Sequence, residues 1–139
     1  MASPDVVGSF APGTGGLSHP VNPTRVLDSR PAPNQVGPFN TPWGPNTTRD
    51  VPIAGNGGVP ATGATAALLN VTVTGASATG FLTVWPSGQA APLASSLNWV
   101  AGRTIPNSVT TKLGAGGAIS VRNANGDVHV IADAAGWCG

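Results

Sequence analysis

The chain has 139 residues, of which 8% are charged and 40% are hydrophobic, and its formal net charge is +1. A chain of this length is expected to form one domain around a single core. So few charges give no basic surface for nucleic acid or an anionic bilayer, and no segment approaches the roughly 18 apolar residues of a membrane-spanning helix.

Glycine and proline account for 20 and 14 residues. Each glycine costs about 1 kcal/mol and each proline about 3 kcal/mol in a helix interior relative to alanine, so long helices are disfavoured. The remaining sequence is rich in Val, Thr, Leu and Ala, and the β-branched residues suit short strands between turns. This composition predicts an all-β fold.

The N-terminal segment differs in composition from the rest of the chain. Residues 1–22 contain Gly, Pro, Ser and small apolar residues without a period, whereas regular alternation begins at Thr24. We therefore expect an extended N-terminal arm over residues 1–22, with Phe10 as a candidate interface contact, and one domain over residues 23–139. The segment has neither the basic start nor the apolar run of a signal peptide, so synthesis without export is expected.

Strand-like runs separated by turn residues follow at residues 24–30, 49–55, 64–74, 81–85, 94–100, 108–113, 118–123 and 127–133. In the third run, Leu69, Val71 and Val73 fall on one face and Asn70 and Thr72 on the other, which is typical of a half-buried strand. The runs predict hairpins over 64–85 and 108–123 and a meander in the C-terminal half. The expected fold is an antiparallel β-sandwich, with a jelly roll as one arrangement of it.

Few side chains are suited to catalysis. The chain has two histidines, one cysteine, no tyrosine and no glutamate, and it lacks a nucleophile elbow, a zinc-protease helix motif and a phosphate-binding glycine loop. His129 and Asp133 lie four residues apart in one run, about 13 Å along a strand, which is too far for a direct base and orienter pair. We therefore expect no enzymatic activity, no metal and no cofactor.

The charged residues are clustered. Arg25, Asp28 and Arg30 lie within one strand-like run, and Asp133 lies in the last run. Because the arginine fork binds carboxylates through paired hydrogen bonds, this clustering predicts a structural salt-bridge network in which the first strand's arginines pair with Asp133 or Asp28.

Four tryptophans and one cysteine complete the candidate residues. Trp43 lies in a Pro-rich segment that indicates a loop, where it could serve as a sugar-stacking platform or as an anchor at a protein interface. A core position is the alternative for Trp43 and the expectation for Trp85, Trp99 and Trp137. Cys138 cannot form an internal disulfide, so a free thiol and an intermolecular bond both remain open.

The motifs RVLDSR, GGVPATGATAALLNVTVT and VHVIADAAGW carry a family resemblance. Together with the runs between them, over about residues 23–137, they resemble a β-rich module of actinobacterial secreted and cell-surface proteins and of virion proteins from phages of actinobacteria. The resemblance implies a β-rich structural or binding module, and it assigns no functional site.

An initiator Met, a private arm and the lack of an export signal favour the virion setting. We therefore expect a capsid decoration or stabilising protein on the phage head, with the major capsid protein and other copies of itself as partners. Neither nucleic acid nor a membrane is expected as a partner. The alternative is a tail or actinobacterial cell-surface or secreted module that binds host-envelope glycan through Trp43.

Overall fold

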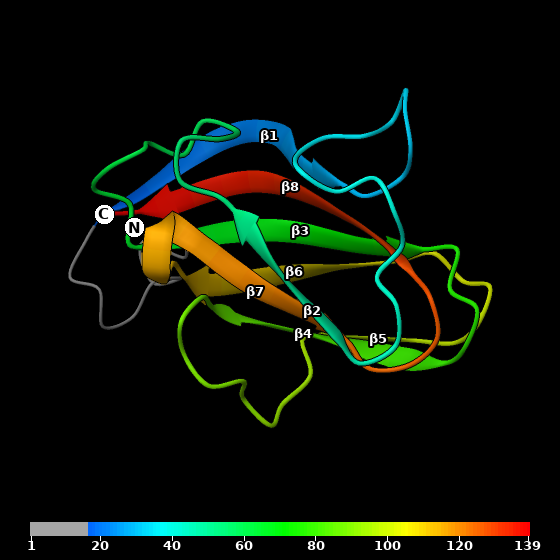
Figure 1. The fold of residues 1–139 in the computed structure, drawn as a ribbon. Coiled ribbons are helices and arrows are strands. Elements are labelled where there is room, and N and C mark those ends of the chain that lie inside the picture. The colour runs from blue at the N-terminus through cyan, green and yellow to red at the C-terminus, as the bar shows by residue number, and fades with distance from the viewer. Residues whose placement is uncertain (1–16) are drawn as a thin grey trace.

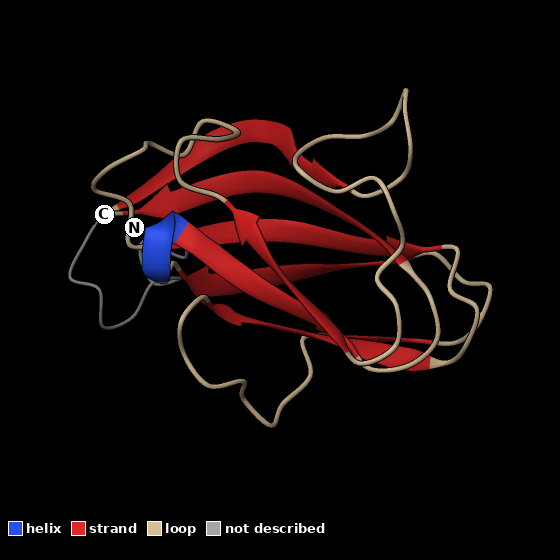
Figure 2. Cartoon of the chain, in the orientation of Figure 1, coloured by secondary structure: helices blue, strands red, loops and turns tan. Residues whose placement is uncertain are grey.

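A computed structural model describes residues 17–139 (Figure 1). Its strands are β1 (Ser18–Asp28), β2 (Thr47–Pro52), β3 (Ala66–Thr74), β4 (Gly80–Pro86), β5 (Leu97–Trp99), β6 (Ile105–Lys112), β7 (Ala118–Asn123) and β8 (His129–Cys138). A short 3₁₀ turn, Ala115–Gly117, precedes β7. Each strand overlaps one of the predicted runs, in the same order, so the all-β prediction is confirmed (Figure 2). Within the described residues, no helix is long and apolar enough to cross a membrane.

Two four-stranded antiparallel sheets pack face to face (Figure 1). One sheet has the order β1-β8-β3-β6 and the other has the order β2-β7-β4-β5. The first strand therefore pairs with the last, the second with the seventh, the third with the sixth and the fourth with the fifth. A long hairpin rolled across both sheets gives this order, which is the eight-stranded jelly roll.

The predicted hairpins and the C-terminal meander are wrong. β3 and β4 lie in opposite sheets, as do β6 and β7, and β5 to β8 alternate between the sheets. A strand, a Gly-rich turn and a second strand form the same local pattern whether the chain reverses within one sheet or crosses to the other. Here β3 pairs instead with β6 and β8, which lie much further along the chain.

The predicted boundary of the N-terminal arm is also wrong. Ser18 pairs with Cys138 and Pro20 pairs with Gly136, so residues 18–22 belong to β1 and extend its sheet. The strand continues past Pro20 and Pro23 through register shifts on either side of Thr24. Proline is tolerated there because β1 is an edge strand. Residues 1–16, including Phe10, lie outside the described residues.

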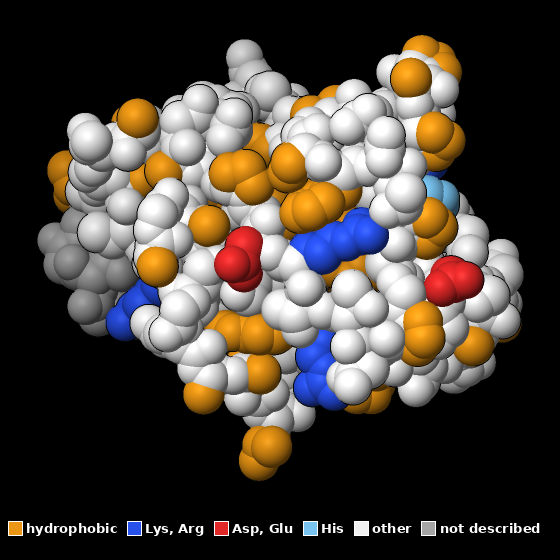
Figure 3. Space-filling view, in the orientation of Figure 1, with side chains coloured by type: hydrophobic (Ala, Val, Ile, Leu, Met, Phe, Trp, Pro, Cys, Tyr) orange, Lys and Arg blue, Asp and Glu red, His pale blue; other side chains and the backbone are white. Residues whose placement is uncertain are grey.

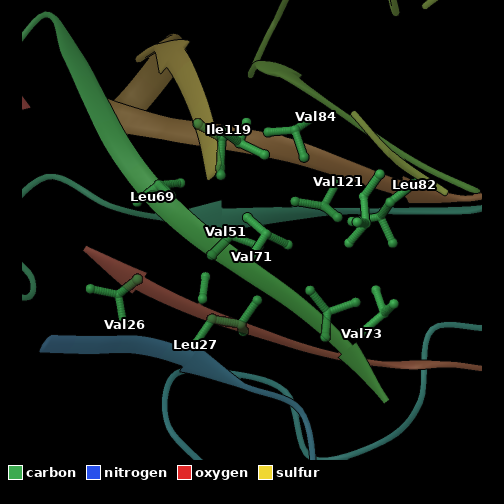
Figure 4. Close-up of a cluster of buried hydrophobic side chains, with 14 of the residues drawn as sticks. Val26, Leu27, Val51, Leu69, Val71, Val73, Leu82, Val84, Ile119 and Val121 are labelled. Carbon is green, nitrogen blue, oxygen red and sulfur yellow. The ribbon is translucent and has the colours of Figure 1, made fainter. Parts of the chain in front are cut away.

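The core forms between the two sheets. Leu69, Val71 and Val73 of β3 face Ile119 and Val121 of β7 across the sandwich, as the alternation of their sequences predicts (Figure 4). The full set of labelled core side chains is Val26, Leu27, Val51, Leu69, Val71, Val73, Leu82, Val84, Ile119 and Val121. Burial of each such side chain stabilises the fold by about 1.5–3 kcal/mol, so this layer is the main source of stability.

Gly57 brings the loop between β2 and β3 against β1 and β8. Its φ is +60°, and a Cβ there would meet Val26 Cγ1 and lie 3.2 Å from Ala134 Cβ. We expect Gly57→Ala to lower the free energy of unfolding by about 2–4 kcal/mol, from left-handed backbone strain and overpacking. Gly102→Ala is the control, because Gly102 has a φ of +77° but no atom within 4 Å of its Cβ position. Urea unfolding that gave equal losses for the two variants would contradict this packing.

Candidate functional site

Asp28 is the most deeply buried charged residue of the RVLDSR motif. It ends β1, and the chain then folds back so that Asp28 and Val36 exchange backbone hydrogen bonds of 2.9 and 3.1 Å. Its side chain is 1% exposed. Arg30 donates from Nε to Oδ1 at 3.0 Å and from Nη2 to Oδ2 at 2.7 Å, and its backbone N–H donates to Oδ1 at 3.1 Å. A buried carboxylate is thus held by a bidentate fork.

Arg25 extends this arrangement across the sheet. It lies opposite Asp133 in the β1–β8 pairing, and its Nε donates to Asp133 Oδ1 at 3.0 Å. Its Nη1 lies 3.5 Å from Asp28 Oδ2. The four residues of the predicted network are therefore in contact, but Arg25 and Asp133 have side chains that are 42% and 22% exposed. The Arg25–Asp133 pair is a surface pair, whereas Asp28 is the buried centre of the network.

The pKa of Asp28 reflects two opposing effects. Burial raises the pKa of this carboxyl, but the hydrogen bonds and charge of Arg30, with a smaller contribution from Arg25, outweigh burial and leave the pKa below its usual value. The hydrogen bond to Asp133 raises the pKa of Arg25, and the hydrogen bonds to Asp28 raise the pKa of Arg30. Asp28 is therefore an ionised structural group and is unsuited to act as a general acid near neutral pH.

Ser29 and His129 lie beside this network. The backbone N–H of Val130 donates to Ser29 Oγ at 3.0 Å, and Ser29 Oγ lies 3.1 Å from His129 Nδ1. Ser29 is completely buried, so its hydroxyl joins β8 to the segment after β1 and is closed to a substrate. Asp133 contacts Arg25. It is not expected to contact His129, because the two residues lie four positions apart along β8. Among residues 17–139, no three His, Cys, Asp or Glu side chains gather closely enough to hold a metal ion.

Trp43 does not occupy the exposed loop position that its sequence context indicates. Its exposed fraction is 0%, and its Nε1 donates to the carbonyl of Val121 at 2.9 Å. Phe39 packs edge-on against its ring at 5.4 Å between centroids, and the guanidinium of Arg49 lies 4.5 Å above it. The hypotheses of a sugar-stacking platform and of an interface anchor both require an accessible ring. Burial therefore overturns both.

Arg49 closes the surface over Trp43. It donates to the carbonyls of Thr41 and Pro42 at 2.9 and 3.0 Å and to Thr41 Oγ1 at 2.8 Å. Burial lowers the pKa of Arg49. These hydrogen bonds compensate for the desolvated charge and hold the loop before β2 in place.

A polar cluster that the sequence did not predict lies on the outer face of the second sheet. Asp50 Oδ1 accepts hydrogen bonds from Ser120 Oγ at 2.6 Å and from Ser87 Oγ at 3.3 Å. Both serines are 4% exposed. The cluster connects β2, β7 and the end of β4. Its hydrogen bonds therefore have a structural role. Nothing in the sequence links these residues, because 37 and 70 positions separate Asp50 from its two partners.

Cys138 is completely buried and lies beside Ser18, with 3.7 Å between Ser18 Oγ and Cys138 Sγ. A thiol in this position behaves as a small apolar side chain, and it would need local opening to reach another molecule. The free-thiol interpretation therefore fits this structure better than an intermolecular disulfide does.

Few charged side chains of the described residues are left without a partner on the surface. Within residues 17–139, only Arg103, Lys112 and Asp127 have a charged side chain without a hydrogen bond or ion pair to the rest of the chain. On the face that Figure 3 shows, charged groups are few and scattered among polar and hydrophobic atoms. The exposed large hydrophobic side chains of the described residues are Leu17, Phe81, Leu93 and Val100.

The fold and these contacts define the class of the protein as an eight-stranded jelly-roll β-sandwich. No protein-family model matches the chain, and no curated protein matches it. Its function must therefore be argued from its own surface and contacts.

Proposed function

We propose that this chain is a non-enzymatic structural protein of a bacteriophage particle, a decoration protein that stabilises the capsid by docking on the head. The observation that carries the proposal is the surface, which has few unpaired charges yet keeps large apolar side chains in solvent. Such a surface is poorly suited to a free protein at high concentration, and it suits one that packs against neighbours. The partners are the major capsid protein and further copies of the chain.

Most carboxylates of the described residues are hydrogen-bonded within the chain, which supports a docking role over a catalytic one. Asp28 is held by Arg30, Asp133 by Arg25, and Asp50 by two serine hydroxyls. Ser29, which contacts a histidine, is buried. These polar groups already bind other parts of the fold and stabilise the sandwich. The surface would therefore bind a partner through its shape and through apolar contacts.

A jelly roll also serves lectins, so the fold alone does not favour a virion over a glycan-binding role. The glycan alternative depended on Trp43, and the burial of that ring removes its only named contact. The virion role is therefore the better supported proposal. Docking through the arm concerns residues 1–16, outside the described residues, and stands as part of the proposal.

The proposal is tested by locating the protein. Particles produced by cells that encode the chain are purified on a density gradient, and fractions are probed with an antibody raised against the full chain. We expect the chain to sediment with DNA-filled heads and to be present in many copies per particle. Recovery only in the cell-envelope fraction or the particle-free medium would contradict the proposal and favour a surface or secreted module.

A further inference from the structure

The loop between β4 and β5 contains the longest uninterrupted exposed stretch within residues 17–139. Residues 88–95 are all exposed, and Leu93 has a relative exposure of 105%. The loop projects from the sandwich (Figure 1). Exposed loop tips with small residues are the preferred sites of proteolytic cleavage in folded proteins. The loop therefore presents a segment of chain that an endopeptidase can reach.

The backbone of residues 90–94 is available to bind another molecule. Among the hydrogen bonds within residues 17–139, none involves a backbone N–H or C=O of this segment. A peptide that binds in an extended conformation is held mainly through its main-chain N–H and C=O groups. A strand such as β4 is less suitable, because its main-chain groups already pair with β5 and β7. Residues 90–94 can thus enter a protease cleft without breaking a hydrogen bond of the fold.

The residues of this segment indicate the class of protease. Pro92 restricts its own φ and biases Ala91 toward extended backbone, so less conformational entropy is lost when the segment binds in an extended form. Leu93 follows, and its exposed side chain can enter an apolar specificity pocket like that of chymotrypsin. Residues 88–95 contain no Lys or Arg, so a protease that cleaves after basic residues has no site in this stretch.

Both ends of the loop are attached to the sandwich. At its start, Trp85 Nε1 donates to the carbonyl of Gln89 at 2.9 Å. At its end, the backbone N–H of Ser96 donates to the carbonyl of Leu82 at 2.8 Å. A cut between Gln89 and Ser96 would leave both attachments in place.

The strand order predicts that the cut chain stays assembled. β1 to β4 precede the loop and β5 to β8 follow it. Every strand pairing of the described residues joins one strand of the first group to one of the second. The core also takes side chains from both groups, such as Val71 of β3 and Val121 of β7. Neither half has a strand pair of its own, so the folded state of each half requires the other.

We propose that the peptide bond between Leu93 and Ala94 is a specific cleavage site for an endopeptidase with an apolar specificity pocket, and that cleavage converts the chain into a two-chain sandwich. Water is the co-reactant. The C–N bond between the two residues breaks, the carbonyl carbon of Leu93 gains the hydroxyl group, and the nitrogen of Ala94 gains the hydrogen. The inference goes beyond the proposed function, because it does not depend on docking to a capsid.

The test is limited digestion of the purified full chain with chymotrypsin under native conditions, followed by mass spectrometry and size-exclusion chromatography. Within residues 18–139 the first cut is expected between Leu93 and Ala94. The two products are expected to elute together at the position of the intact chain and to separate only in denaturant. Leu93→Ser is expected to slow cleavage in the loop about 100-fold or more, because serine leaves the apolar pocket unfilled.

Leu17→Ser is the matched control, since Leu17 is 74% exposed but lies outside the loop. It is expected to leave the rate of cleavage between Leu93 and Ala94 unchanged. An earlier cut at another bond of residues 18–139 would overturn the inference, as would a Leu93→Ser variant that is cut in the loop as fast as the wild type. Products that separate without denaturant would also overturn it. A chain that resists this cut but sediments with phage heads would refute the cleavage site and leave the capsid role intact.

Discussion

Trp43→Ala is expected to lower the free energy of unfolding by about 4 kcal/mol or more. Truncation of a buried tryptophan leaves a large cavity and typically costs about 3–5 kcal/mol. At this site it also removes the hydrogen bond to the Val121 carbonyl and the ring beneath the Arg49 guanidinium. Arg49 would then have its charge partly buried over a cavity. Urea unfolding followed by circular dichroism measures the loss.

Trp43→Phe separates the ring from its hydrogen bond. A phenyl ring can still fill much of the space between Phe39 and Arg49, but it cannot donate to Val121. We expect this variant to lose about 1–2 kcal/mol, the usual cost of a buried carbonyl left without its donor. If Trp43→Ala unfolded within about 1 kcal/mol of the wild type, the ring would lie in solvent and the exposed-platform hypothesis would return.

The strands and their inward faces could be predicted because both are local properties of the sequence. In β3 the alternation of Leu69, Val71 and Val73 with polar residues determines which side of the strand meets the core, whatever strand lies beside it. The β-sandwich followed from the number of such strands and from the lack of any long helical period. Pairing could not be predicted in the same way, since the partners of β3 are β6 and β8.

The positions of the candidate residues could likewise be predicted only where the sequence restricts the possible partners. The Arg25–Asp133 contact could be predicted because charges are so scarce that few other pairs exist. For Trp43 the sequence left a surface loop and a core position open, because Pro and Gly neighbours indicate a loop whereas the large ring suits a core. The structure shows the core position. The backbone of Trp43 exchanges hydrogen bonds of 2.8 and 3.1 Å with Val128, and these carry the ring inward. The sequence near Trp43 contains no sign of Val128, which lies in the segment leading into β8.

Asp28→Asn is expected to lower the free energy of unfolding by about 2–3 kcal/mol near neutral pH. The amide occupies the same buried space but carries no charge, so the bidentate contact with Arg30 is lost. Removal of one partner of a fully buried pair costs about 3–5 kcal/mol. The expected loss is smaller here because the Arg30 side chain is 34% exposed and can still be hydrated.

Arg25→Ala is the control for Asp28→Asn. Arg25 and Asp133 are both partly exposed, and surface pairs of this kind contribute about 0–1 kcal/mol. We therefore expect Arg25→Ala to change the free energy of unfolding by less than about 1 kcal/mol. A larger loss from Arg25→Ala than from Asp28→Asn would place the energetic centre of the network on the exposed pair and contradict the assignment to Asp28.

The effect of Asp28→Asn should also depend on pH in a direction that the native contacts determine. Burial raises the pKa of Asp28, but Arg30 and Arg25 together hold it below the unfolded value of about 3.9. The ionised carboxylate therefore contributes its full stability above about pH 4, and this contribution is lost as the pH falls through the native pKa. The amide that replaces the carboxyl in Asp28→Asn does not titrate, so the difference in free energy of unfolding between wild type and variant should narrow below about pH 4. A difference that stayed constant on acidification would mean that Asp28 is not held ionised by its arginines.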